Sequence, residues 1–118
     1  MKISFDYDGV FSESEFQKEA RVLKAAGHEI CIVTKRAKLE AEAEDPVLNA
    51  ARSAGISEVH FTSGADKYPV LEAIGADAHY DDSDAELKLI NANCKKTIGV
   101  KAQRMKKTDA SRRMKEKY

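Results

Sequence analysis

Short apolar segments alternate with longer segments of helical periodicity along most of the chain. Each apolar segment is four or five residues long and is bounded by polar or glycine-containing turns, which is typical of buried strands. Strands that alternate with helices in this way form a parallel sheet with helices on its faces. The pattern predicts an α/β fold, a three-layer Rossmann-like domain with a five-stranded parallel sheet. The expected strands are residues 2–6, 29–33, 58–62, 78–81 and 96–100.

The segments between the strands carry signals for the beginning and end of helices. Side chains suited to capping a helix N-terminus precede them: Ser12 with Glu15, Asp45 before Pro46, and Ser83 with Glu86. Glycines follow their expected ends at positions 27, 55 and 75. The segment 35–44, "KRAKLEAEAE", fits either a helical turn or an ordered loop.

The length of 118 residues fits one domain with one continuous core. We expect residues 1–100 to form this domain and residues 101–118 to form a basic C-terminal tail. The tail holds 8 of the 20 Lys and Arg residues but 2 of the 20 Asp and Glu residues, so it carries +6 and the body −6. Two interpretations follow, packing on the acidic body or binding of nucleic acid phosphates. We favour the first, because Tyr118 alone offers the tail an aromatic ring for base stacking.

Composition excludes several classes of protein. Hydrophobic residues make up 42% of the chain and charged residues 34%, as in ordinary globular domains. No segment approaches the roughly 18 apolar residues that span a bilayer, and the N-terminus has no signal-peptide pattern. Cys31 and Cys94 form no CxxC pair, which favours free thiols over a disulfide or a zinc site. We therefore expect a cytoplasmic protein without membrane contact.

Acidic residues gather at the carboxyl ends of two expected strands. Asp6 and Asp8 follow the first strand, and Asp81 and Asp82 end the fourth. In extended chain, side chains two residues apart lie on the same side, roughly 6–7 Å from each other. Gly9 then allows a tight turn. Because the carboxyl ends of parallel strands share one edge of the sheet, we expect the four carboxylates to meet there.

Four neighbouring carboxylates repel one another unless a cation is held between them. A hard divalent cation with oxygen ligands, most plausibly Mg²⁺, resolves this conflict. The alternative is purely structural: D-x-D-G as a polar turn, and "DDSDAE" as the acidic N-terminus of a helix. The alternative explains each motif alone but not their common position at one sheet edge.

The motifs resemble those of the haloacid dehalogenase-like superfamily. "ISFDYDG" is similar to its first motif, "ICIVT" to its second, and "AHYDDSDAE" to its acidic fourth motif. Lys67, at the start of a helix after the third strand, stands where the family has its motif-three lysine. The four motifs occur in the family's order within residues 1–100.

The resemblance implies a role for each motif residue. Asp6 would be the nucleophile that becomes an aspartyl phosphate. Asp8 would protonate the leaving oxygen and later deprotonate the attacking water. Thr34 would bind the phosphoryl oxygens, and Lys67 would offset their charge.

The resemblance also implies a metal site and substrate contacts. Mg²⁺ would be held by Asp6, the backbone carbonyl of Asp8, and Asp82, with Asp81 as a further ligand or a support. The turn at Gly9 would contact the substrate. Val10 departs from the family, which most often has Thr there, so that a hydroxyl is missing.

No cap domain is expected, because few residues separate Gly9 from the first helix or Thr62 from Lys67. An open site suits a phosphate on a large molecule, although a nucleotide also fits. Arg36, two residues after Thr34, resembles an arginine of family members that act on nucleotides and nucleic acid ends, where it would grip phosphate. The alternative, that Arg36 is an ordinary exposed basic residue of a loop, has equal weight.

The expected function is a Mg²⁺-dependent phosphomonoester hydrolase that acts through an aspartyl phosphate, on nucleotide or nucleic acid end phosphates. One alternative is a catalytically weak module of the same fold that binds partners through its acidic pocket and basic tail. Another is a receiver-like signalling domain, phosphorylated at a strand-end aspartate. The receiver-like domain leaves Asp8 unexplained.

Overall fold

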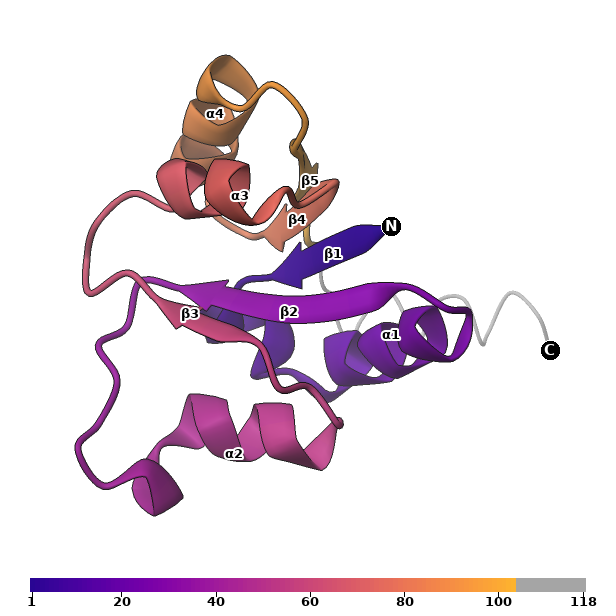
Figure 1. Ribbon diagram of the computed structural model, residues 1–118, viewed down its shortest axis with the longest axis vertical. Helices are drawn as coiled ribbons and strands as arrows, with labels where there is room; N and C mark the ends of the chain where they lie inside the picture. The colour runs from indigo at the N-terminus through magenta and orange to yellow at the C-terminus, as the bar shows by residue number, and fades with distance from the viewer. Residues whose placement is uncertain (104–118) are drawn as a thin grey trace, which may run out of the picture.

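The computed structural model describes residues 1–103, which form one parallel sheet with helices on both faces (Figure 1). The strand order is β3-β2-β1-β4-β5, and all four pairings are parallel. The predicted three-layer α/β fold with a five-stranded parallel sheet is thereby confirmed. The strands are β1 (Lys2–Phe5), β2 (Glu29–Thr34), β3 (Val59–Phe61), β4 (Ala78–Asp81) and β5 (Ile98–Lys101).

Two helices cover each face of the sheet (Figure 1). Helices α1 (Ser14–Ala25) and α2 (Pro46–Ser53) lie on one face, and α3 (Tyr68–Ile74) and α4 (Asp84–Asn93) on the other. Alternate side chains of a strand point to opposite faces, so β2 contributes to both cores. Ile32 packs with the residues of α1 and α2, whereas Val33 packs with those of α3 and α4.

The helix N-termini follow the sequence signals in two cases of three. Asp45 caps α2 by accepting hydrogen bonds from two backbone N–H groups, and Ser83 caps α4 through the N–H of Glu86. The expected cap at Ser12 is wrong. Helix α1 begins at Ser14, and the Ser12 hydroxyl instead accepts the N–H of Gly9 at 3.0 Å. The turn after β1 uses this oxygen, so the helix begins later.

That turn is η1 (Tyr7–Phe11), which connects β1 to α1. Backbone hydrogen bonds between residues five apart close it: the N–H of Phe11 donates to the carbonyl of Asp6, and the N–H of Ser12 donates to the carbonyl of Tyr7. Gly9 has φ +75°, a conformation that costs other residues about 1–2 kcal/mol. The segment 35–44, left open by the sequence, is a loop that ends in a short helical turn, η2 (Glu42–Glu44).

No cap domain interrupts the described residues, because β1 leads through η1 to α1 and β3 leads to α3 through residues 62–67. Both cysteines are free thiols. Within residues 1–103, none of the helices is long and apolar enough to cross a membrane.

The ordered chain continues past the expected boundary at residue 100. Strand β5 ends at Lys101, and Ala102 is buried, with its N–H bonded to the carbonyl of Asp81. Apart from its first three residues, the expected basic tail lies outside the described part of the chain.

Candidate functional site

The carboxyl ends of β1 and β4 form the centre of the site. Asp6 follows β1 directly, Asp81 is the last residue of β4, and the N–H of Asp6 bonds to the carbonyl of Tyr80 at 2.9 Å. The sheet order reverses between these strands, since β2 and β3 lie beyond β1 while β5 lies beyond β4. Such a switch point leaves a crevice between the diverging connections, where ligands of parallel α/β proteins bind.

Lys67 joins the two carboxylates. Its ammonium lies 2.7 Å from Asp6 Oδ1 and 2.7 Å from Asp81 Oδ2. Only 2% of the Lys67 surface is exposed, and a buried ammonium is stable only when it is paired. Lys67 is the last residue before α3. Residues from the expected first, third and fourth motifs are therefore in direct contact.

The two aspartates have different electrostatics. Burial raises the pKa of Asp6 to about 7, with further upward contributions from Asp81 and Asp82, although Lys67 opposes them. Burial also acts against ionisation of Asp81, yet hydrogen bonds from His79, Lys67 and the Ser83 N–H hold its pKa well below the ordinary value. Asp81 is therefore a permanent carboxylate at neutral pH, whereas Asp6 titrates there.

Asp82, the residue directly after β4, adds a third carboxylate to the crevice. One ligand oxygen each from Asp6, Asp81 and Asp82 lies within 4.8 Å of the others. Asp82 packs over Gly9 so closely that a Cβ at position 9 would collide with its carboxylate. The missing side chain thus creates the space in which Asp82 sits. Three clustered carboxylate oxygens fit Mg²⁺, which prefers hard oxygen ligands.

Asp8 and Arg36 face each other. The guanidinium donates from Nε to Asp8 Oδ2 at 3.0 Å and from Nη2 to Asp8 Oδ1 at 2.8 Å, which makes a bidentate ion pair. The guanidinium also lies 5.1 Å from the ring centroid of Tyr7, within the range of a cation–π contact. Asp8 lines the crevice, but Arg36 does not.

Thr34 and Val10 are structural in this conformation. Thr34 is buried, does not line the crevice, and its hydroxyl accepts the N–H of Arg36 at 3.2 Å. It holds the start of the loop after β2. Val10 is fully buried in the core beneath α1 and α2, where a hydroxyl would lack a partner in apolar surroundings.

The structure places most predicted residues together in an open crevice of about 440 Å³. Of the predicted site, the crevice includes Asp6, Asp8, Gly9, Lys67, Asp81 and Asp82. Thr34 and Arg36 do not line it: Thr34 accepts the N–H of Arg36, and Arg36 reaches the crevice only through its pair with Asp8. The catalytic and ligand roles of all eight residues stay predictions.

Sequence reasoning missed Lys35 and Glu86, which also line the crevice. Their side chains form an ion pair, and Glu86 is nearly buried. The capping box predicted that Glu86 would turn back to the N–H of Ser83, but that N–H bonds to Asp81 instead. Glu86 Oε2 has no hydrogen-bond partner among the described residues. The sequence could have indicated Lys35, because it directly follows the carboxyl end of a strand, where ligands of parallel sheets bind.

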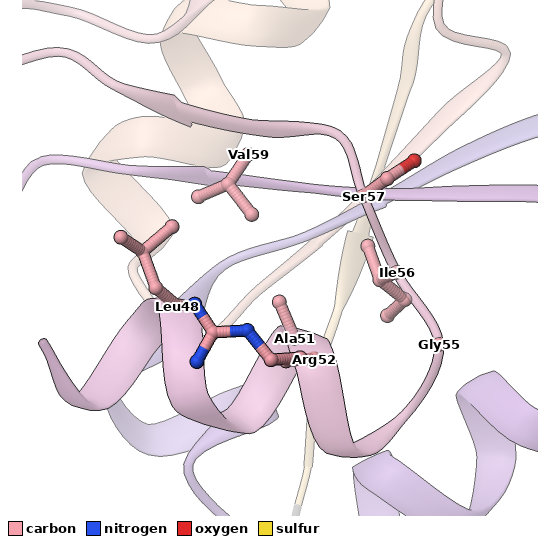
Figure 2. Close-up of a pocket in the computed structure, with 7 residues that line it drawn as sticks. All are labelled: Leu48, Ala51, Arg52, Gly55, Ile56, Ser57 and Val59. Carbon is pink, nitrogen blue, oxygen red and sulfur yellow. The ribbon is translucent and has the colours of Figure 1, made fainter. Parts of the chain in front are cut away.

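A second hollow, of about 360 Å³, lies between α2 and the segment that enters β3 (Figure 2). It shares no residue with the acidic crevice. Arg52 is its one charged residue, and the rest of its lining is mostly apolar. The titratable groups needed for chemistry are therefore concentrated in the acidic crevice.

When the chain is compared with known proteins, it matches no family model, no curated protein and no solved structure.

Proposed function

We propose that the protein is a Mg²⁺-dependent phosphomonoester hydrolase of the haloacid dehalogenase-like type. The observation that carries the proposal is the position of Lys67 between Asp6 and Asp81, with Asp82 beside them at the switch point of the sheet. A carboxylate can approach an anionic phosphate only where positive charge offsets the repulsion. The crevice combines a fixed ammonium with a triad of oxygen ligands for a cation, which supports that chemistry.

The proposed reaction has two steps. Asp6 attacks phosphorus with a carboxylate oxygen, the bond from phosphorus to the ester oxygen breaks, and Asp8 gives a proton to the leaving oxygen. Asp8 then takes a proton from a water molecule, whose oxygen attacks the aspartyl phosphate and releases inorganic phosphate and Asp6. Lys67 keeps Asp6 oriented and offsets charge on the phosphoryl oxygens.

A bound Mg²⁺, held by Asp6 and Asp82 with Asp81 beside them, would supply further positive charge for the phosphoryl group. The Asp8 carbonyl completes this proposed ligand set. Because the cluster offers oxygen donors only, magnesium suits it better than a thiolate-preferring metal.

Two cations near the crevice are positioned to receive the substrate. Lys35 lines the crevice, and its side chain is 41% exposed, so it is accessible to an arriving phosphate. Arg36 pairs with Asp8, and movement of its guanidinium toward a phosphate would free Asp8 for proton transfer. The open, capless crevice fits a phosphate on a nucleotide or at a nucleic acid end.

The ion pair of Asp8 with Arg36 favours a second candidate function. If the pair persists when a ligand is bound, Asp8 has no proton-transfer role, and the protein is a binding module with weak or no turnover. The two functions differ in whether a bound phosphomonoester is consumed.

The test is a phosphate-release assay with p-nitrophenyl phosphate, nucleoside monophosphates and oligonucleotides phosphorylated at the 3′ or 5′ end. We expect turnover that requires Mg²⁺, stops in excess chelator, and is lost in Asp6→Asn. Undiminished turnover in chelator would contradict the metal assignment. Binding of these ligands without phosphate release, in the presence of Mg²⁺, would favour the binding module.

A further inference from the structure

A buried chain of hydrogen bonds runs behind the acidic crevice. Ser4 Oγ lies 2.8 Å from His79 Nδ1, and His79 Nε2 lies 2.9 Å from Asp81 Oδ2. Ser4 and His79 are partners in the parallel pairing of β1 with β4, and both are fully buried. Both residues lie within the strand segments of the first and fourth motifs, but neither was assigned a role there.

The direction of these hydrogen bonds follows from the other partners of Asp81. Its carboxylate already accepts from the Lys67 ammonium and, at 3.0 Å, from the Ser83 N–H. A carboxylate with such donors is ionised and can only accept, so His79 Nε2 carries a proton. With a proton on Nε2, the other ring nitrogen, Nδ1, is left to accept from the Ser4 hydroxyl at 2.8 Å. The chain therefore runs from Ser4 through His79 to Asp81.

We propose that His79 and Ser4 are positioning residues, which fix the orientation of the Asp81 carboxylate toward Lys67 and toward a divalent cation. Asp81 Oδ2 is bound by two N–H donors and Oδ1 by one, so its side chain has one arrangement. Through Lys67, the same arrangement reaches Asp6. The inference rests on the proposed function only in taking the acidic cluster as a cation site.

Four variants separate positioning from stability. His79→Leu removes the donor to Asp81, His79→Gln retains an amide N–H at a similar reach, and Ser4→Ala removes only the outer hydrogen bond. His60→Leu is the matched control, because His60 Nε2 lies 2.9 Å from a Glu58 oxygen, and neither residue lines the crevice. The measurement is the Kd for Mn²⁺, a spectroscopic substitute for Mg²⁺, by electron paramagnetic resonance.

We expect His79→Leu to raise the Kd for Mn²⁺ by about 10–100-fold, the usual effect of removing a partner that orients a metal ligand. His79→Gln should restore most of the affinity, Ser4→Ala should have a smaller effect than His79→Leu, and His60→Leu should have none. ¹⁵N NMR of the wild-type protein should show His79 protonated at Nε2.

An unchanged Kd in folded His79→Leu would overturn the inference, even if its melting temperature falls. If His79→Leu does not fold, two other results would overturn the inference. One is loss of Mn²⁺ affinity in His79→Gln, and the other is a proton on Nδ1 of His79 in the wild type. Wild-type protein that binds Mn²⁺, responds to His79→Leu as expected and releases no phosphate would leave the inference standing and remove the proposed function. Mg²⁺-dependent turnover by the wild type, together with a Kd for Mn²⁺ that does not change in His79→Leu, would support the proposed function and overturn the inference.

Discussion

Asp6 is 6% exposed, and its carboxyl group shares the ammonium of Lys67 with Asp81. Its pKa of about 7, against an ordinary value near 3.8, means that the folded protein holds this proton more tightly than the unfolded chain does. The contribution of Asp6 to stability is therefore full below pH 3.8 and is lost as the pH rises through 7. The buried carboxyl group of Asp6 therefore stabilises the fold less at neutral pH than in acid.

Asp6→Asn should consequently be more stable than the wild type at pH 8 in the absence of divalent cations. The difference in the free energy of unfolding should grow between pH 4 and 8, bounded by about 4 kcal/mol at about 1.4 kcal/mol per pH unit. Urea unfolding of both proteins at several pH values measures it. A difference independent of pH would contradict the burial of a titrating Asp6.

The turn η1 and the loop after β2 bring the remaining groups of the crevice into place. In η1, Gly9 is required for two separate reasons, its φ of +75° and its close approach to Asp82. In the loop, Lys35 pairs with Glu86 across the crevice. For each of these two elements, a pair of variants can distinguish an effect on stability from an effect on the geometry of the crevice.

Gly9→Ala should both destabilise the fold and displace Asp82, whereas Gly27→Ala should only destabilise it. Gly27 has φ +97° with open space where an added methyl group would lie, so it shares the backbone cost of about 1–2 kcal/mol without a collision. We expect Gly9→Ala alone to weaken Mg²⁺ binding, measured by calorimetry. Equal Mg²⁺ affinity in the two variants would show that the position of Asp82 does not matter for the cation.

Lys35→Met should raise the KM for p-nitrophenyl phosphate by about tenfold, the equivalent of roughly 1.4 kcal/mol of lost charge pairing. The same change leaves buried Glu86 without its ion-pair partner and so lowers stability. The double variant Lys35→Met with Glu86→Gln removes that buried charge and should recover stability but not KM. Lys38→Met, in the same loop and paired with Glu42, should leave KM unchanged. Recovery of KM in the double variant would assign Lys35 a structural role only.

At the scale of the whole molecule, charge is divided between residues 1–103, which are acidic overall, and a basic C-terminal segment. Residues 104–118 hold seven basic and two acidic residues. A truncation must keep residues 101–103, because Lys101 donates to the carbonyl of Asp82 and Ala102 to that of Asp81. Cutting at residue 100 would remove support for the acidic crevice together with the tail.

Removal of residues 104–118 should preserve turnover of p-nitrophenyl phosphate, because all the residues with a proposed catalytic or ligand role precede residue 104. We expect a lower melting temperature and an equal effect on small and oligonucleotide substrates, since a basic segment is attracted to an acidic body. The measurement is KM for both substrates at two salt concentrations. A loss confined to the oligonucleotide, and steep in salt through counterion release, would show that the segment binds nucleic acid.

The sequence alone determined the architecture and the meeting of the acidic motifs. Apolar periodicity and the caps at Asp45 and Ser83 located the elements to within a few residues, because these signals are local. Parallel strands place their carboxyl ends at one edge, so Asp6 and Asp81 had to lie along the same edge, and the pairing of β1 with β4 makes them neighbours there. The cap at Ser12 failed because the turn η1 competes for its hydroxyl.

Only the tertiary structure decided which side chains bind one another across that edge. The bridge of Lys67, the pair of Asp8 with Arg36, and the chain from Ser4 through His79 to Asp81 each join segments that are distant in sequence. Side-chain partners depend on strand order, on burial and on which oxygen is already occupied, and none of these has a local sequence signal. Periodicity places His79 and Asp81 on the same face of β4, two residues apart, but the contact of His79 with Ser4 follows from the register of β1 with β4.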